Sequence, residues 1–329
     1  MSNYFENQEL FLEPKVKQYG SHMVMTNVHK PSKTKYINID TRFRDEYNYN
    51  EVVNFNLTLP EKINDIKKLK VKSIELPMTM YNISAALGNN YFKLSNITLN
   101  VSYVITIPDG QYDLTGLQTV INNQISLLSY NNIIYNNILT YLVFDITGNH
   151  SRFYRTIRPG AASPNDDYDL TIDFAVDKYG NFDKYNFKTK LGWLLGYRNL
   201  TYTITMLDFG NNSPNYTNSD VYIDLNVNKY LYLAIDEFSK SNPNSFITPL
   251  PTSLINKSII SRISLDKAHY SFNTIMTANM FNGLLISDER TYSGKIDLQK
   301  INIQLLNEFG YPISLNGMDF SLCLEVEYE

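Results

Sequence analysis

The feature that most constrains the fold is a two-residue alternation of apolar and polar side chains that recurs along the chain. It is clearest in the last nine residues before the C-terminal Glu329, where Phe320, Leu322, Leu324, Val326 and Tyr328 alternate with Ser321, Cys323, Glu325 and Glu327. The same period runs over residues 53–59, 221–227 and 301–305. A strand directs successive side chains to opposite faces, so the pattern predicts strands with one buried face. Such strands are typical of antiparallel sheets.

Other segments extend this pattern and add one helix. Strand-like runs occur at 36–39, 69–76, 104–107, 141–146, 168–176 and 230–235, and the run at 53–59 ends at Pro60. Over 113–128, Asp113 is a helix cap, and Leu117, Ile121 and Ile125 share one helical face. Many strands with a single helix predict a mainly β fold, an antiparallel, jelly-roll-like β-sandwich with an inserted small α+β module.

The predicted organisation has three parts. Residues 1–33 lack strand or helix periodicity and are interpreted as an extended N-terminal arm, with a disordered tail as the alternative. Residues 34–105 and 200–329 form the outer β-sandwich, and residues 106–199 form the inserted module that holds the helix near 113–128. The final strand is expected to pair near the strands at 53–59 or 69–76. The glycine-rich stretch 191–197 is interpreted as a helical turn or buried loop.

Composition excludes several protein classes. The single cysteine cannot form a disulfide within the chain, and 29 Lys and Arg against 33 Asp and Glu give a net charge of −4, unlike a basic nucleic-acid binder. No run approaches the roughly 20 apolar residues that span a bilayer. We therefore expect a soluble protein with no transmembrane segment and no specific nucleic-acid partner. The 26 Tyr and 40 Asn fit either genome bias or hydrogen-bonded contact surfaces.

The sequence gives no sign of an enzyme. The four histidines lack metal-ligand spacing, and no nucleophile elbow, phosphate loop or dinucleotide fingerprint is present. Clustered carboxylates at 166–173 and 325–329 are interpreted as solvated faces rather than a glycosidase pair. We expect no catalytic residues, no metal and no cofactor.

Two charged clusters are the candidate subunit contacts. The first comprises Arg42, Arg44 and Asp45, which could bind phosphate, lock a loop through ion pairs or pair with a partner subunit. The second comprises Lys68, Lys70 and Lys72, which share one face of a strand. Lysines protect exposed edge strands, so this run is interpreted as an edge, with a nucleic-acid stripe as the alternative.

An ordered set of short motifs resembles a known family. The segments are Tyr36–Asp45, Ile74–Pro77 followed by Tyr81-Asn82-Ile83 and Asn89–Phe92, Ile107–Tyr112, Leu191–Arg198 and Asn316–Leu322. Their order resembles that of structural proteins of giant, nucleocytoplasmic large DNA viruses, of the minor capsid or vertex type. The resemblance implies jelly-roll-like sandwiches and a structural role in the virion, and it implies no catalytic residues.

The expected function is that of a non-enzymatic virion structural protein. It would be a minor capsid component that cements or supports the icosahedral shell through arm and edge-strand contacts. Its partners would be other capsid proteins, including the major capsid protein, in a multi-subunit assembly. It would reside in the virion capsid, assembled in the host cytoplasm. The alternative is a carbohydrate- or receptor-binding β-sandwich on a viral fibre or spike, with exposed Tyr and Trp193 stacking on sugars. The competing interpretation of Trp193 is a core residue.

Overall fold

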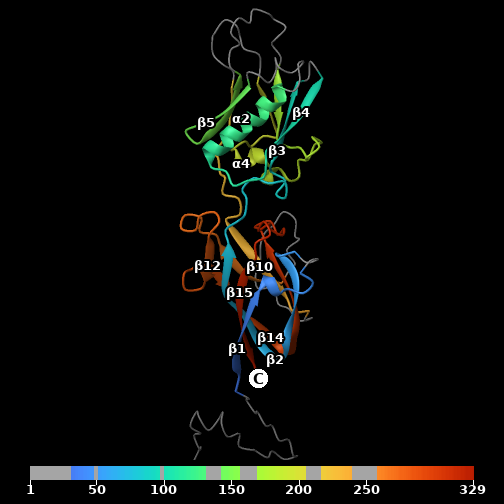
Figure 1. Cartoon of the computed structure of the whole chain (residues 1–329), viewed down its shortest axis with the longest axis vertical. Helices are drawn as coiled ribbons and strands as arrows, with labels where there is room; N and C mark the ends of the chain where they lie inside the picture. Colours follow the sequence, from blue (N-terminus) through green and yellow to red (C-terminus); the bar gives the residue numbers. More distant parts are fainter. Residues whose placement is uncertain are drawn as a thin grey trace, which may run out of the picture. The chain divides into compact units, whose positions relative to one another are not determined.

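The chain divides into two compact units in the computed structural model. Unit 1 comprises Met1–Met78 and Tyr230–Glu329, and unit 2 comprises Thr79–Lys229 (Figure 1). The structure describes residues 31–47, 51–96, 100–130, 142–155, 169–204, 216–238 and 258–329. All but the last three residues of the expected arm at 1–33 lie outside these ranges.

Unit 1 is built from antiparallel strands. Within its described residues they are β1 Lys33–Asp40, β2 Asn54–Pro77, β10 Tyr230–Asp236, β11 Ile259–Ser264, β12 Ile275–Asn279, β13 Leu285–Ser287, β14 Arg290–Leu306 and β15 Ser321–Tyr328. The short 3-10 helix η1 spans Thr41–Phe43. The strands run in the order β1-β15-β2-β14-β10-β11-β13, and β12 pairs with β2. The sheet curls, so that its last strand β13 comes back to β2. The backbone N–H of Val71 in β2 donates to the hydroxyl of Ser287 in β13 at 3.0 Å.

The C-terminal strand β15 lies inside the sheet, between β1 and β2. Leu324 is paired with Ile37 on one side and with Val71 on the other. Leu322, Leu324 and Val326 are buried, and the intervening residues are half-buried, so the alternation of this strand is confirmed. Its pairing with the 69–76 region is also confirmed.

Strand β2 is one 24-residue strand, although the sequence predicted two strands separated at Pro60. The prediction of a break there is wrong. The pairing with β14 shifts register between Lys300, which is opposite Thr58, and Leu298, which is opposite Ile63. Pro60 therefore falls in an irregularity of the ladder, where its missing N–H costs no regular hydrogen bond.

Unit 2 holds smaller sheets and the long helix. Among its described residues, β4-β3-β7-β8 form one sheet and β5-β6-β9 form another. The elements are β3 Tyr91–Asn96, β4 Val101–Thr106, α2 Leu114–Tyr130, β5 Leu142–Thr147, β6 His150–Arg155, β7 Leu170–Asp173, η3 Phe187–Thr189, α4 Leu191–Leu194, β8 Thr201–Ile204 and β9 Tyr216–Asn218. With these two units, the predicted fold class of a mainly β, antiparallel, jelly-roll-like sandwich with an inserted α+β module is confirmed.

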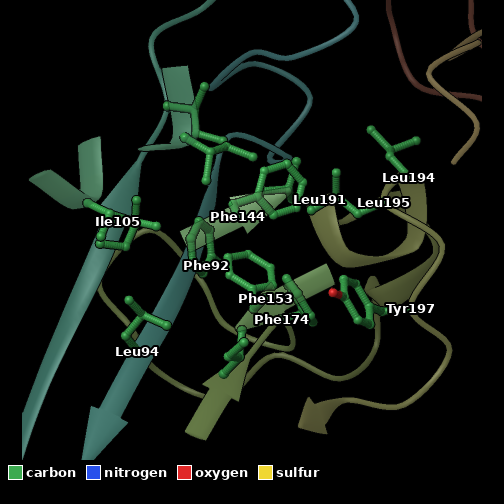
Figure 2. Packing of buried hydrophobic residues seen from close by; sticks show 14 of the residues in the cluster. Phe92, Leu94, Ile105, Phe144, Phe153, Phe174, Leu191, Leu194, Leu195 and Tyr197 are labelled. Atoms are coloured by element: carbon green, nitrogen blue, oxygen red, sulfur yellow. The ribbon is translucent and has the colours of Figure 1, made fainter. Parts of the chain in front are cut away.

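The core of unit 2 is aromatic. Figure 2 shows Phe92, Phe144, Phe153, Phe174 and Tyr197 gathered between the strands and α4. The ring centroids of Phe144 and Phe153 are 4.8 Å apart, as are those of Phe174 and Tyr197. Tilted and stacked ring pairs of this kind add about 0.5–1.5 kcal/mol each beyond burial. Part of the aromatic excess therefore lies in a core.

The predicted helix is confirmed as α2. Asp113 caps it, because its carboxylate accepts the N–H of Gly116 at 2.6 Å, and Leu117, Ile121 and Ile125 are buried. Asn122 also exchanges two hydrogen bonds, of 2.8 and 2.9 Å, with the backbone of Phe144 in β5. The helix therefore serves the edge of β5 as a neighbouring strand would.

Two expectations differ from the structure. The predicted strand at 221–227 is wrong, because its N–H groups donate to residues outside any strand: Val221 to Gly196, Ile223 to Asn149 and Asp224 to Leu194 at the end of α4. The expected boundaries at 105/106 and 199/200 instead fall at 78/79 and 229/230. Strands β3 and β8 both pair with β7, which draws residues 91–106 and 201–204 into unit 2.

Candidate functional site

The loop that follows β1 carries the first predicted cluster, and the structure divides its members. Arg44 is buried, donates to the Thr41 carbonyl at 2.7 Å and pairs with Asp319 at 3.0 Å. Its guanidinium also lies over the ring of Tyr47, 3.9 Å from the ring centre. Arg44 therefore connects the loop to the segment before β15. This agrees with one of the three alternatives for the cluster, a loop held in place by ion pairs.

Asp45 and Arg42 are also engaged within the chain. Asp45 accepts hydrogen bonds from the N–H and hydroxyl of Thr58 at 3.1 and 2.6 Å. Arg42 lies on the surface and pairs with Asp40 at 2.5 Å, which lowers the pKa of that carboxyl. The same loop exposes Phe43, whose side chain is 74 % exposed and which no charge pattern in the sequence indicated.

The lysines of the second cluster form an ion-pair ladder on β2. Lys70 and Lys72 contact the two oxygens of Glu325 at 2.6 and 2.9 Å. Lys68 contacts Glu289 at 2.9 Å and Glu327 at 3.4 Å. The prediction of an edge strand is wrong here, because β2 lies between β15 and β14. The lysines form cross-strand ion pairs with the glutamates of the neighbouring strand β15 instead.

The ladder shifts the titration of its acids. The hydrogen bond from Lys70, followed by those from Lys72 and Tyr36, lowers the pKa of Glu325 to about 2, against a smaller opposing effect of burial. The pKa of Lys68 is raised, mainly by its hydrogen bond to Glu289. The Glu325 carboxylate therefore stays ionised beside the two lysines at neutral pH.

In the described part of unit 1, exposed apolar side chains gather in the stretch from β12 to β13. Phe281 at the turn is 99 % exposed, and its neighbours Ile275, Met280 and Ile286 are exposed as well. The turn is held by side-chain amides. The side-chain oxygen of Asn279 accepts the backbone N–H groups of Phe281 and Asn282, each at 2.9 Å. The side-chain amide of Asn282 donates to the backbone carbonyl of Thr277 at 2.7 Å. Phe281 is therefore presented on an ordered turn.

The sequence contains a signal for this turn. Met280 and Phe281 interrupt an Asn-x-x-Asn-Gly segment, and Gly283 has a φ of +73°. An apolar pair inside a turn sequence predicts exposed apolar side chains, since turns lie at the surface. Such patches on soluble proteins mark interaction sites.

Trp193 is packed on several sides, which bears on the alternative of sugar stacking. The guanidinium of Arg198 lies 3.8 Å from its ring centre, and the ring of Phe187 meets it edge-on at 5.9 Å. Arg198 is held there by donating to the carbonyl oxygens of Trp193 and Tyr197 at 2.9 and 3.0 Å. The half-buried indole packs against the core of unit 2 without lying inside it, so the interpretation of Trp193 as a core residue holds only in part.

The histidines and carboxylates of the described residues do not form a metal site. Over the described ranges, no group of three or more His, Cys, Asp and Glu could hold a metal ion. His150 lies 3.1 Å from the hydroxyl of Ser219, but that hydroxyl donates to the Val221 carbonyl at 2.9 Å. No helix in the described part of the chain is long and apolar enough to cross a membrane.

The chain resembles solved structures but matches no protein family model. No family model matches the chain, and no curated protein matches it by sequence. Among solved structures, the chain is similar to the crystal structure of the selenomethionine-labelled mavirus penton protein. The TM-score is 0.44 and the sequence identity is 12 %, over 91 % of this chain and 100 % of that chain.

Proposed function

We propose that the chain is a non-enzymatic structural protein of a virus particle, a minor capsid component that cements or supports the icosahedral shell. Its partners would be other capsid proteins, including the major capsid protein. The observation that carries the proposal is the fully exposed Phe281 on its amide-held turn, flanked by exposed apolar side chains. An isolated soluble protein gains nothing from such a group, whereas an aromatic anchor held in place is typical of an interface hot spot.

A second support is the sheet edge at β1. In the described part of unit 1, β1 is paired on one side only, with β15. An open edge can take up a strand from another subunit through backbone hydrogen bonds. The edge-strand contact expected from the sequence is therefore assigned to β1 rather than to the lysines of β2. The exposed Phe43 ends the short 3-10 helix η1 that follows this strand.

The proposal is tested on purified virus particles. We expect mass spectrometry to find the chain in them, cross-linked to a capsid protein through unit 1. Phe281→Ser should reduce incorporation, while Tyr311→Ser, which removes another exposed aromatic side chain of unit 1, should not. Particles that lack the chain would refute the proposal. Equal incorporation of both variants would exclude Phe281 as the anchor.

A further inference from the structure

One segment of unit 2 exposes aromatic and basic side chains together. Tyr179 is 74 % exposed, Phe182 63 % and Tyr185 88 %, and the lysines Lys178, Lys184 and Lys188 are interleaved with them. The segment consists of a near-duplication, Asp-Lys-Tyr-Gly-Asn-Phe at 177–182 and Asp-Lys-Tyr-Asn-Phe at 183–187. Large aromatic side chains seldom remain this exposed without a partner. We call these six residues the aromatic-lysine surface.

The backbone beneath the first repeat is fixed. One carboxylate oxygen of Asp177 accepts the N–H groups of Tyr179 and Asn181 at 2.8 and 2.9 Å. Gly180 has a φ of +83° and packs so closely on Val104 of β4 that a Cβ would clash. Lys93 of β3 also donates to the Gly180 carbonyl at 3.3 Å. The turn is therefore docked on the β3–β4 pair, and Tyr179 is presented without the cost of ordering a loose loop.

The acidic residues of the repeats form hydrogen bonds or ion pairs within the described part of unit 2, whereas the lysines of the surface have no carboxylate partner there. Asp177 is bound to the turn, and Asp183 pairs with the buried Lys190 at 2.9 Å. Across the described residues, Lys178, Lys184 and Lys188 form no ion pair with a carboxylate. Their ammonium groups lie over aromatic rings instead. Lys178 and Lys184 are 5.0 and 5.4 Å from the rings of the tyrosines that follow them, and Lys188 is 6.0 Å from that of Trp193.

We infer that the aromatic-lysine surface binds an acidic polysaccharide with sulfate groups. The electron-rich faces of Tyr179 and Tyr185 attract the slightly positive C–H groups of a sugar ring. Three ammonium groups without carboxylate partners attract sulfates along a chain. The Lys-Tyr pair occurs twice, so the surface offers the same kind of contact at two places.

The charge pattern favours a polysaccharide over a single-stranded nucleic acid. Nucleic-acid binders of this kind track the phosphates along a continuous basic groove. Here Asp183 interrupts the lysines, and the segment contains no arginine that could stack on a base. This inference stands apart from the proposed structural role, since it concerns unit 2 and a different ligand.

Heparin binding to the purified full chain tests the inference, measured by calorimetry at physiological salt. We expect saturable binding that weakens with salt, and no binding of neutral dextran. Tyr179→Ala with Tyr185→Ala should weaken it by about tenfold or more, while Tyr179→Phe with Tyr185→Phe retains it. Thermal unfolding should be unchanged because both side chains lie at the surface.

A charge-matched pair of variants separates the surface from bulk attraction. Changing Lys178, Lys184 and Lys188 to Gln should abolish binding, whereas Lys33, Lys62 and Lys300 to Gln in unit 1 should not. Equal losses in the two variants would overturn the inference, as would absence of heparin binding or full binding by the double alanine variant. Tighter binding of a single-stranded oligonucleotide of equal charge would overturn the choice of polysaccharide.

Discussion

Arg290 donates from Nη1 to Oε2 of Glu237 across 2.6 Å, and both side chains are completely buried. The other oxygen of Glu237 accepts the hydroxyl of Tyr292 at 2.7 Å, and burial raises the pKa of that tyrosine. Arg290 also donates to the carbonyl oxygens of Ile235 and Ser258 at 2.9 and 3.0 Å. This ion pair therefore joins the end of β10, the residue before β11 and the first residue of β14.

We predict that Arg290→Met destabilises unit 1 by about 3–5 kcal/mol, because it leaves the carboxylate of Glu237 buried without its charge partner. The double variant Arg290→Met with Glu237→Leu should lose less, since no uncompensated charge remains. Urea unfolding followed by circular dichroism measures both. The exposed control Arg42→Met should change stability by less than about 1 kcal/mol. An unchanged midpoint for Arg290→Met would contradict the prediction.

The ion-pair ladder predicts a loss of stability in acid. The pKa of Glu325 is about 2 in the folded chain, against an ordinary value of 4.5, so the folded state binds this proton less readily than the unfolded state. Its contribution is complete above pH 4.5 and is lost as the pH falls toward 2. Glu325→Gln should therefore flatten stability against pH in this window and cost about 1 kcal/mol at neutral pH after solvent screening. Glu61→Gln, which removes the exposed partner of Lys35, is the control and should leave the slope unchanged.

Local periodicity was sufficient to predict the elements that bury one face of regularly spaced apolar side chains. Helix α2 and strand β15 were predicted because the spacing of apolar residues in each indicates both the kind of secondary structure and the side that is buried. The candidate contacts were harder, because their roles depend on distant residues. Arg44 is locked by Asp319, 275 positions away, and nothing near Arg44 in the sequence indicates that pairing.

The lysines illustrate the same limit for strand position. Alternation placed Lys68, Lys70 and Lys72 on one face correctly, but it does not say which strands lie on either side. The glutamates at 325 and 327 supplied a hint, since opposite charges on two alternating strands predict cross-strand pairs. The segment 221–227 fails for the complementary reason, because alternation describes an extended chain whether or not a neighbouring strand completes the ladder.

Truncation at Gly317 should unfold unit 1. The deletion removes β15 from between β1 and β2, exposes the apolar face that Leu324 covers and leaves Arg44 without Asp319. We expect loss of cooperative unfolding by circular dichroism and aggregation during purification. A control that removes only Glu329 should fold. A truncated chain that stays monomeric, soluble and cooperatively folded would refute the assignment of β15 as a central strand.

The close approach at Gly196 gives a prediction for unit 2. Its φ is +92°, and a Cβ there would overlap the carbonyl oxygen of Val221. That oxygen can move away only if the backbone moves with it. Gly196→Ala should therefore cost roughly 3 kcal/mol or more, from the left-handed backbone and the clash together. Trp193 is the chain's only tryptophan and lies in unit 2, so its fluorescence during urea unfolding measures this unit. Gly148→Ala is the matched control, because its φ is +60° but nothing lies within 4 Å of a Cβ, and it should cost only about 1 kcal/mol. Equal losses for the two variants would show that the clash with Val221 does not limit the stability of unit 2.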